Sequence, residues 1–261
     1  MDEIKKLTAD EFEDMVSRHS FERKLLAKDY YITVLLYLLK GIKGIYFKGG
    51  TALNKIFLDH ARLSEDIDFT LERNLKEVKP EIVSVIENSK IFNKTTEDKN
   101  VEGFLRIVVH YKGFSGEDGE IFIDLNERGK LLGKPEEHKI DHFYPDNIPP
   151  FLVKTLSKEE MIAEKVAATI GRNKPRDHFD VYKIIKLSLP INLELVKRKC
   201  KDSGDEFSII KMFNQSQKLH KRWNEDMIPL LAEEISFKEV MTFLAKHFKL
   251  KEEKDNLKTK K

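Results

Sequence analysis

The sequence predicts an α/β protein in the α+β arrangement, with a mixed-sheet lobe followed by an all-helical lobe. Between residues 45 and 125, apolar and polar residues alternate in short segments, as in half-buried strands. After residue 150 this alternation gives way to segments with helical periodicity. Residues 126–150 are rich in Gly, Pro and charged residues. We therefore predict a boundary there, with domains 1–150 and 151–261.

The elements of the first 71 residues follow from caps and periodicity. Thr8 and Glu11 form a capping box that predicts a short helix, and residues 21–40 predict a more apolar one. Residues 45–48 predict a strand that enters a Gly49-Gly50 turn, and residues 51–58 predict the helix that leaves it. Residues 66–71 predict a second strand.

The later elements show the same strand-like alternation and helical periodicity. Pro80 predicts the start of a helix that ends near residue 89. FLRIVVHYK and EIFIDLN flank GFSGEDG, which indicates two strands joined by a hairpin turn. Further helices are expected near residues 157–171, 177–188, 192–202, 206–221 and 235–247. The lysine-rich tail from residue 246 is expected to fray.

Composition excludes several classes of protein. The chain has 261 residues and a formal net charge of +2, so any nucleic-acid site must be local. Its single cysteine, Cys200, excludes an intrachain disulfide and a cysteine-rich metal site, and favours a cytoplasmic location. The longest apolar stretch, residues 30–39, is too short to span a bilayer. We therefore expect a soluble protein with no membrane partner.

Asp66 and Asp68 carry the main chemical signal. Alternate residues of a strand project to the same side, so these two carboxylates should face one space and repel each other unless a cation lies between them. Mg²⁺ (or Mn²⁺) binds one or two carboxylates and completes its shell with phosphate oxygens and water. The Gly49-Gly50-Thr51 turn at a helix N-terminus can bind those phosphates.

A third carboxylate would complete a two-metal site. Asp124 is the candidate, because a charge within the apolar run IFIDLN needs a partner. Asp118 and Glu120 compete with it for this role. Alone, a glycine pair is usually only a turn and an alternating aspartate pair is usually a solvated strand edge. Their joint occurrence favours the metal and phosphate interpretation.

Two segments carry a family resemblance. FKGGTALNK with RLSEDIDF resembles the AbiEii/AbiGii toxin family of nucleotidyltransferases, within the DNA polymerase β-like superfamily. AEKVAATIGRNKPRDHFDVY, residues 163–182, is similar to that family's helical motifs. The gap between the glycines and Asp66 is longer than in the wider superfamily and is compatible with the narrower family. Residues 1–40 and those beyond about 190 match only in helical character.

The resemblance implies roles for residues of the first motif. The triphosphate of an NTP would be bound by the nucleotide-binding residues Lys48, Gly49, Gly50 and Thr51. Arg62 and Ser64 would support the aspartate strand and would also belong to the nucleotide-binding residues. The metal ligands would be Asp66, Asp68 and Asp124, with the active site in the cleft between the two lobes.

The second motif adds Lys165, Arg172 and Asp177. Lys165 matches the family's essential lysine, and its spacing from Arg172 puts both cations on one helix face, where they could grip a polyphosphate. The alternative is that both are ordinary solvated helix charges. Asp177 and Asp180 are spaced to orient one of these cations or to cap their helix, and Asp177 is the favoured functional residue. His178 is expected at the surface.

The leading hypothesis is a metal-dependent nucleotidyltransferase that transfers NMP from an NTP to an acceptor. By the resemblance, the acceptor is RNA, such as a tRNA 3′ end, and the enzyme is the toxin of an AbiE-type toxin–antitoxin pair with a cognate antitoxin as partner. Asp124 would be the general base or a metal-sharing residue. Two rivals stay open: a kinase-like transfer of the γ-phosphoryl group, and a non-catalytic antitoxin-binding module.

Overall fold

A computed structural model describes residues 4–172 and 174–259. Contacts divide the chain into two compact units, Met1–Ser157 and Lys158–Lys261, and each is described by itself. The predicted boundary at residue 150 falls before β7 (Leu152–Thr155), which pairs with β1 (Ile45–Lys48) inside the first unit. The division therefore comes later. The predicted order of a mixed α/β unit and a helical unit is confirmed.

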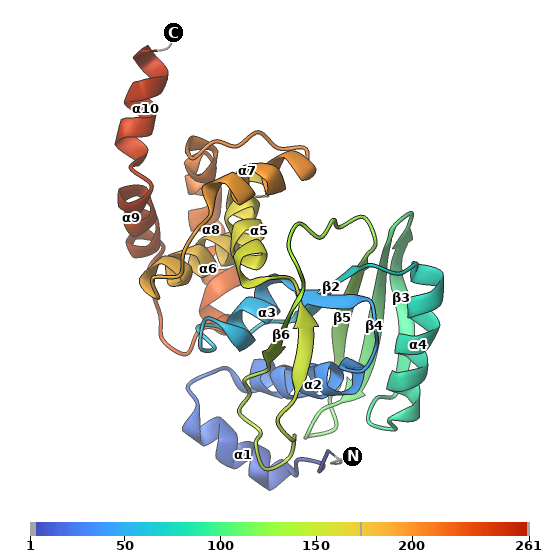
Figure 1. Ribbon diagram of the computed structural model, residues 1–261. Helices are drawn as coiled ribbons and strands as arrows, with labels where there is room; N and C mark the ends of the chain where they lie inside the picture. The colour runs from blue at the N-terminus through green and yellow to red at the C-terminus, as the bar shows by residue number, and fades with distance from the viewer. Residues whose placement is uncertain (1–3, 173, 260–261) are drawn as a thin grey trace. The chain divides into compact units, whose positions relative to one another are not determined.

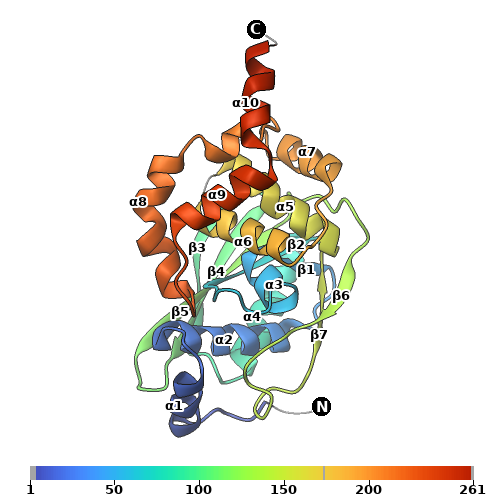
Figure 2. The same cartoon turned by 90° about the vertical axis from the view of Figure 1, so that its left-hand side faces the viewer.

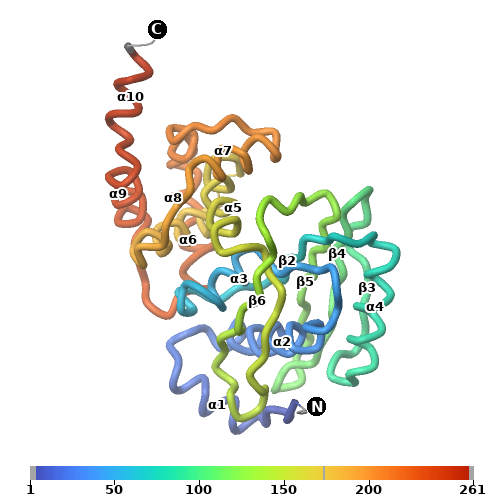
Figure 3. The backbone as a smooth tube through the Cα atoms, viewed as in Figure 1, coloured from blue at the N-terminus to red at the C-terminus, as the bar shows by residue number. Residues whose placement is uncertain are grey.

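A seven-stranded mixed sheet forms the centre of the first unit (Figure 1). Its strand order is β3-β4-β5-β2-β1-β7-β6. The pairs β2/β5 and β1/β7 are parallel, and the other neighbours are antiparallel. Figure 3 follows the backbone from β5 through a long connection to β6 and β7, which end the sheet on the side away from β3. The remaining strands are β2 (Asp66–Leu71), β3 (Lys94–Val101), β4 (Phe104–Lys112), β5 (Asp118–Asn126) and β6 (Glu136–Lys139).

The helices of the first unit are α1 (Ala9–Arg18), α2 (Arg23–Leu39), α3 (Gly49–Ile56) and α4 (Leu75–Asn88). The predicted capping box of Thr8 and Glu11 starts α1. The prediction that Pro80 opens a helix is wrong, because the Asn74 side chain accepts a 2.8 Å hydrogen bond from the Lys76 N–H and starts α4 earlier. Helix α2 contacts β5 and α4, and α4 also contacts β3.

Helices make up the second unit (Figure 2). They are α5 (Lys158–Gly171), α6 (Pro175–Lys186), α7 (Leu193–Asp202), α8 (Ser216–Met227), α9 (Phe237–His247) and α10 (Leu250–Thr259), with short 3₁₀ segments at Ile210–Phe213 and Ile228–Leu230. The prediction of a single helix at 206–221 is wrong, because the 3₁₀ segment Ile210–Phe213 precedes α8 there. The tail from residue 246 was expected to fray, but α10 forms, with acidic residues in its first turn and Lys258 in its last, as the helix dipole favours.

No helix in the described part of the chain has the length and apolar character needed to cross a membrane.

Candidate active site

Four charged residues line up across adjacent strands of the sheet. Asp68 on β2 pairs with Lys48 on β1 and with Asp124 on β5, and Asp124 pairs in turn with Arg106 on β4. Paired residues of neighbouring strands project from the same face of a sheet. Asp66, two residues before Asp68, shares that face. The structure therefore places all three predicted carboxylates on one face of adjacent strands, and we call Lys48, Asp68, Asp124 and Arg106 the charged row.

The alternate residues of the same strands explain this orientation. Ile67, Phe69 and Ile123 are buried, so the apolar side of each strand faces the core and the charged side faces away. The strand register also distinguishes Asp124 from Asp118 and Glu120, the two other candidates for the third carboxylate. Asp118 lies opposite Lys112 with 85% of its side chain exposed, and Glu120 lies opposite His110. Neither reaches the charged row.

Arg106 is a site residue that the sequence reasoning missed. Its Nε lies 2.7 Å from Asp124 Oδ1 and its Nη2 lies 2.8 Å from Oδ2, so the guanidinium binds both carboxylate oxygens. The guanidinium carbon also lies 4.8 Å from the centre of the Phe122 ring. The bond to Asp124 raises the pKa of Arg106, and the charge of Asp66 adds to this. A cation inside the apolar run FLRIVV, opposite Asp124 across the hairpin, was the available signal.

The glycine turn lies against Asp68. Gly49 begins α3 with a φ of +81°, and a Cβ added there would lie 2.2 Å from Asp68 Oδ2. A side chain at this position would therefore displace the carboxylate. The predicted residues Lys48, Gly49, Gly50 and Thr51 thus bring the N-terminal end of α3 next to the aspartate strand.

Side chains of α3 tie the turn to β2 and to the loop before it. The Thr51 hydroxyl donates to the Asp66 carbonyl. Asn54 Nδ2 donates to the Gly50 carbonyl at 2.9 Å. In the loop, Arg62 Nη1 donates to Ser64 Oγ at 3.0 Å, and both side chains are buried. These contacts suit Arg62 and Ser64 to supporting the aspartate strand, while their proposed contact with a nucleotide stays a prediction.

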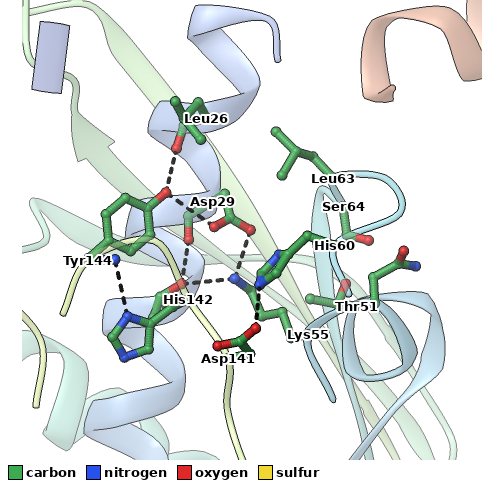
Figure 4. Close-up of polar contacts among 12 residues, drawn as sticks. Leu26, Asp29, Thr51, Lys55, His60, Leu63, Ser64, Asp141, His142 and Tyr144 are labelled. Atoms are coloured by element: carbon green, nitrogen blue, oxygen red, sulfur yellow. Dashed lines mark hydrogen bonds and ion pairs between the residues drawn. The ribbon is translucent and has the colours of Figure 1, made fainter. Parts of the chain in front are cut away.

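A buried ion pair anchors α3 to α2 (Figure 4). Lys55 Nζ lies 2.8 Å from Asp29 Oδ1 and 3.0 Å from Thr33 Oγ1, and both charged side chains are only 2% exposed. The Tyr144 hydroxyl lies 3.1 Å from the other Asp29 oxygen. Such a pair is tolerated in a core because hydrogen bonds satisfy each charge. Sequence reasoning missed it, although Lys55 closes the motif FKGGTALNK.

The second unit holds the other predicted residues in one cluster. Lys165 Nζ lies 3.0 Å from Asp177 Oδ1 and 3.1 Å from Asp180 Oδ2. Arg172 Nε donates to Asp177 Oδ2 at 2.8 Å. Burial alone would raise the pKa of Asp177, but Lys165 and Arg172 outweigh it and hold that pKa well below its ordinary value.

The two cations of this cluster differ in exposure. The Lys165 side chain is 5% exposed, whereas the Arg172 side chain is 57% exposed. Lys165 therefore links α5 to α6 inside the unit, and Arg172 is the more solvent-accessible of the two cations. The expectation that His178 lies at the surface is wrong. Its ring is buried, with its nitrogens 3.0 Å from the Lys174 carbonyl oxygen and 2.8 Å from that of Met212.

The donor chemistry of Asp66 and Asp68 fits a divalent ion whose remaining ligands come from phosphate and water. Within residues 4–172 and 174–259, no three His, Cys, Asp or Glu side chains are gathered so that they could hold a metal ion by themselves. Asp124 is bound to Arg106 instead, so its role as a metal ligand stays a prediction.

Known proteins resemble this chain in sequence and in fold. Residues 40–246 match the family described as nucleotidyl transferase AbiEii toxin of type IV toxin–antitoxin systems. Similar solved structures include JHP933 from Helicobacter pylori, with 19% identity and a TM-score of 0.61 over 92% of this chain and 98% of that one. The nucleotidyltransferase toxin MenT4 from Mycobacterium tuberculosis gives 19% identity and a TM-score of 0.61 over 92% and 99%.

At these identities the solved structures share the fold alone. Among curated proteins, no sequence matches the chain. The family match spans most of the chain and contains the glycine turn, all three aspartates and the helical cluster. The chain therefore belongs to the AbiEii family of nucleotidyltransferase toxins.

Proposed function

We propose that this nucleotidyltransferase moves NMP from an NTP to an RNA acceptor in a reaction that depends on Mg²⁺ (or Mn²⁺). We further propose that it acts in the cytoplasm as a toxin restrained by a cognate antitoxin. One observation carries the proposal: the Asp68 carboxylate lies against the Gly49 backbone at the start of α3. The two carboxylates that we propose to bind metal thus lie next to a helix terminus suited to phosphate.

The chain's own residues supply substrate binding. Backbone N–H groups of Gly49, Gly50 and Thr51 at the α3 N-terminus suit the triphosphate oxygens, because no side chain of the two glycines obstructs them. Lys48, directly before this turn, adds a positive charge. Asp66 and Asp68 would hold the divalent ion, which when bound offsets the negative charge of the triphosphate and of the departing pyrophosphate.

Transfer is a displacement at the α-phosphorus. An acceptor hydroxyl oxygen forms a new bond to this phosphorus, and the bond to the oxygen that bridges to the β-phosphate breaks. Pyrophosphate leaves with that electron pair. The hydroxyl proton passes to a carboxylate oxygen of Asp124, which lies beside Asp68 in the sheet. In the helical unit, Asp177 holds the Arg172 guanidinium, and Lys165 keeps Asp177 in place.

The test is transfer of label from each of the four α-labelled NTPs to total RNA in the presence of Mg²⁺. We expect labelled RNA and released pyrophosphate with at least one NTP, and none with Asp68→Asn. Asp118→Asn is the matched control, because it removes an exposed carboxylate from β5 outside the charged row. No transfer with any NTP would reject the proposal. A parallel assay with γ-labelled NTPs that showed label transfer and release of a nucleoside diphosphate, the outcome of a kinase-like reaction, would also reject it.

Expression in a bacterial host tests the toxin role. We expect the wild-type chain to arrest growth and Asp68→Asn to relieve the arrest. Arrest by Asp68→Asn equal to that by the wild type would indicate that inhibition does not need transfer.

A further inference from the structure

The charged row contains its own fixed cation. Arg106 binds both oxygens of Asp124 at 2.7 and 2.8 Å, while Asp68, one strand away, lies against the Gly49 backbone. The three carboxylates therefore have different surroundings. Asp66 and Asp68 are next to the turn suited to phosphate, and Asp124 is next to an arginine.

The geometry around Arg106 restricts its motion. The planar guanidinium lies over the Phe122 ring and also forms one bond to each carboxylate oxygen of Asp124. Asp98 adds a weaker contact, with its Oδ2 3.7 Å from Arg106 Nη1. Bidentate arginine–carboxylate pairs fix orientation as well as charge, because two bonds define the plane of the carboxylate.

We infer that Arg106 is a positioning residue that holds Asp124 for the acceptor hydroxyl and keeps it apart from the metal-binding pair Asp66 and Asp68. Arg106 also supplies the positive charge that the third carboxylate needs beside Asp68. The inference rests on the proposed function, since it assigns Asp124 to the acceptor side of that same site. It predicts that nucleotide binding and transfer depend on different members of the charged row.

The experiment compares Arg106→Gln, Asp124→Asn and Asp68→Asn by two readouts. Calorimetry measures binding of NTP with Mg²⁺ in the absence of RNA. Single-turnover kinetics at saturating NTP measures transfer to RNA. We expect Arg106→Gln and Asp124→Asn to bind NTP within about 2-fold of the wild type and to transfer at least about 10²-fold more slowly, the usual cost of losing or misplacing a general base. Asp68→Asn should lose NTP binding itself.

Arg73→Gln is the matched control. Arg73 also forms two bonds to one carboxylate, that of Glu81, and its side chain is 30% exposed against 29% for Arg106. It lies outside the charged row, so the control should transfer at the wild-type rate. Arg106→Lys should recover part of the rate, because lysine restores the charge but not the two-point contact. The double variant Arg106→Gln/Asp124→Asn should be no slower than Asp124→Asn alone.

Several results would overturn the inference. These are loss of NTP binding in Arg106→Gln comparable with that in Asp68→Asn, an unchanged transfer rate, an equal loss of rate in Arg73→Gln, or additive losses in the double variant. The binding comparison uses no RNA. A wild-type protein that binds NTP but labels no RNA would therefore reject the proposed acceptor, whereas lost binding in Arg106→Gln would reject the inference about Arg106.

Discussion

Gly49→Ala is expected to slow transfer by about 10²-fold or more at a modest cost in stability. An L residue at a left-handed backbone position costs about 1–2 kcal/mol, and Gly49 has a φ of +81°. The methyl group adds a second effect, because its position lies 2.2 Å from Asp68 Oδ2, whereas ordinary contact begins at 3.4 Å. The carboxylate must therefore retreat by roughly 1 Å, and a displacement of ~1 Å at a reacting centre can cost ~10²-fold in rate.

Gly116→Ala separates the two effects. Gly116 has a φ of +84° in the turn between β4 and β5, and nothing lies within 4 Å of an added Cβ. Both variants should therefore lose about 1–2 kcal/mol, or roughly 2–8 °C in Tm. Only Gly49→Ala should also lose transfer, by about 10²-fold or more.

The assays are thermal unfolding and single-turnover transfer for both variants and the wild type. Equal transfer rates in Gly49→Ala and Gly116→Ala would refute the reasoning, because the close approach to Asp68 would then have no consequence for the site. A Gly49→Ala protein with wild-type stability would refute the assignment of a strained backbone.

Three further predictions concern charged and titratable side chains. Lys55→Met should lower the free energy of unfolding by about 3–5 kcal/mol, because Asp29 is left buried without its cation. Urea denaturation measures this free energy, and a loss below about 1 kcal/mol would contradict the prediction. Lys165→Met should also lower the free energy of unfolding by ~3–5 kcal/mol. Arg172→Gln should lower it by less than about 1 kcal/mol and chiefly weaken substrate binding. Equal losses of stability in the two variants would be inconsistent with the different exposures of the two side chains. Burial, helped by the charge of Lys55, lowers the pKa of His142 to about 4. Because the unfolded chain takes up this proton first, near its ordinary pKa of about 6.5, folding stability should fall as pH drops from about 6.5 to 4. His142→Asn should flatten that dependence in urea titrations at several pH values, and an unchanged slope would contradict the assignment.

Local signals were enough to predict the strands that carry the site. The predicted bounds of β1 and β2 agree with the structure to the residue, because a glycine turn ends one and polar-apolar alternation defines the other. The short strands β6 and β7 were not predicted. Their residues include several charges beside a proline-rich stretch, and only long-range pairing with β1 and with each other makes them strands.

The site residues also divide into those that local sequence signals indicate and those that only long-range contacts bring together. Asp66, Asp68 and Asp124 were predicted because each interrupts an apolar strand. Arg106 does so too, and its register opposite Asp124 follows from the hairpin turn, so it was within reach of the sequence. The Asp29–Lys55 pair was not, because nothing in either helix alone indicates that α2 and α3 bring these side chains together.

Anomalous diffraction from crystals grown with Mn²⁺ and a non-hydrolysable NTP would test the central claim most directly. We predict an anomalous peak roughly 2 Å from carboxylate oxygens of both Asp66 and Asp68, with triphosphate oxygens at the N–H groups of residues 49–51. A nucleotide bound at any other location, or an ion that touches neither aspartate, would contradict the account.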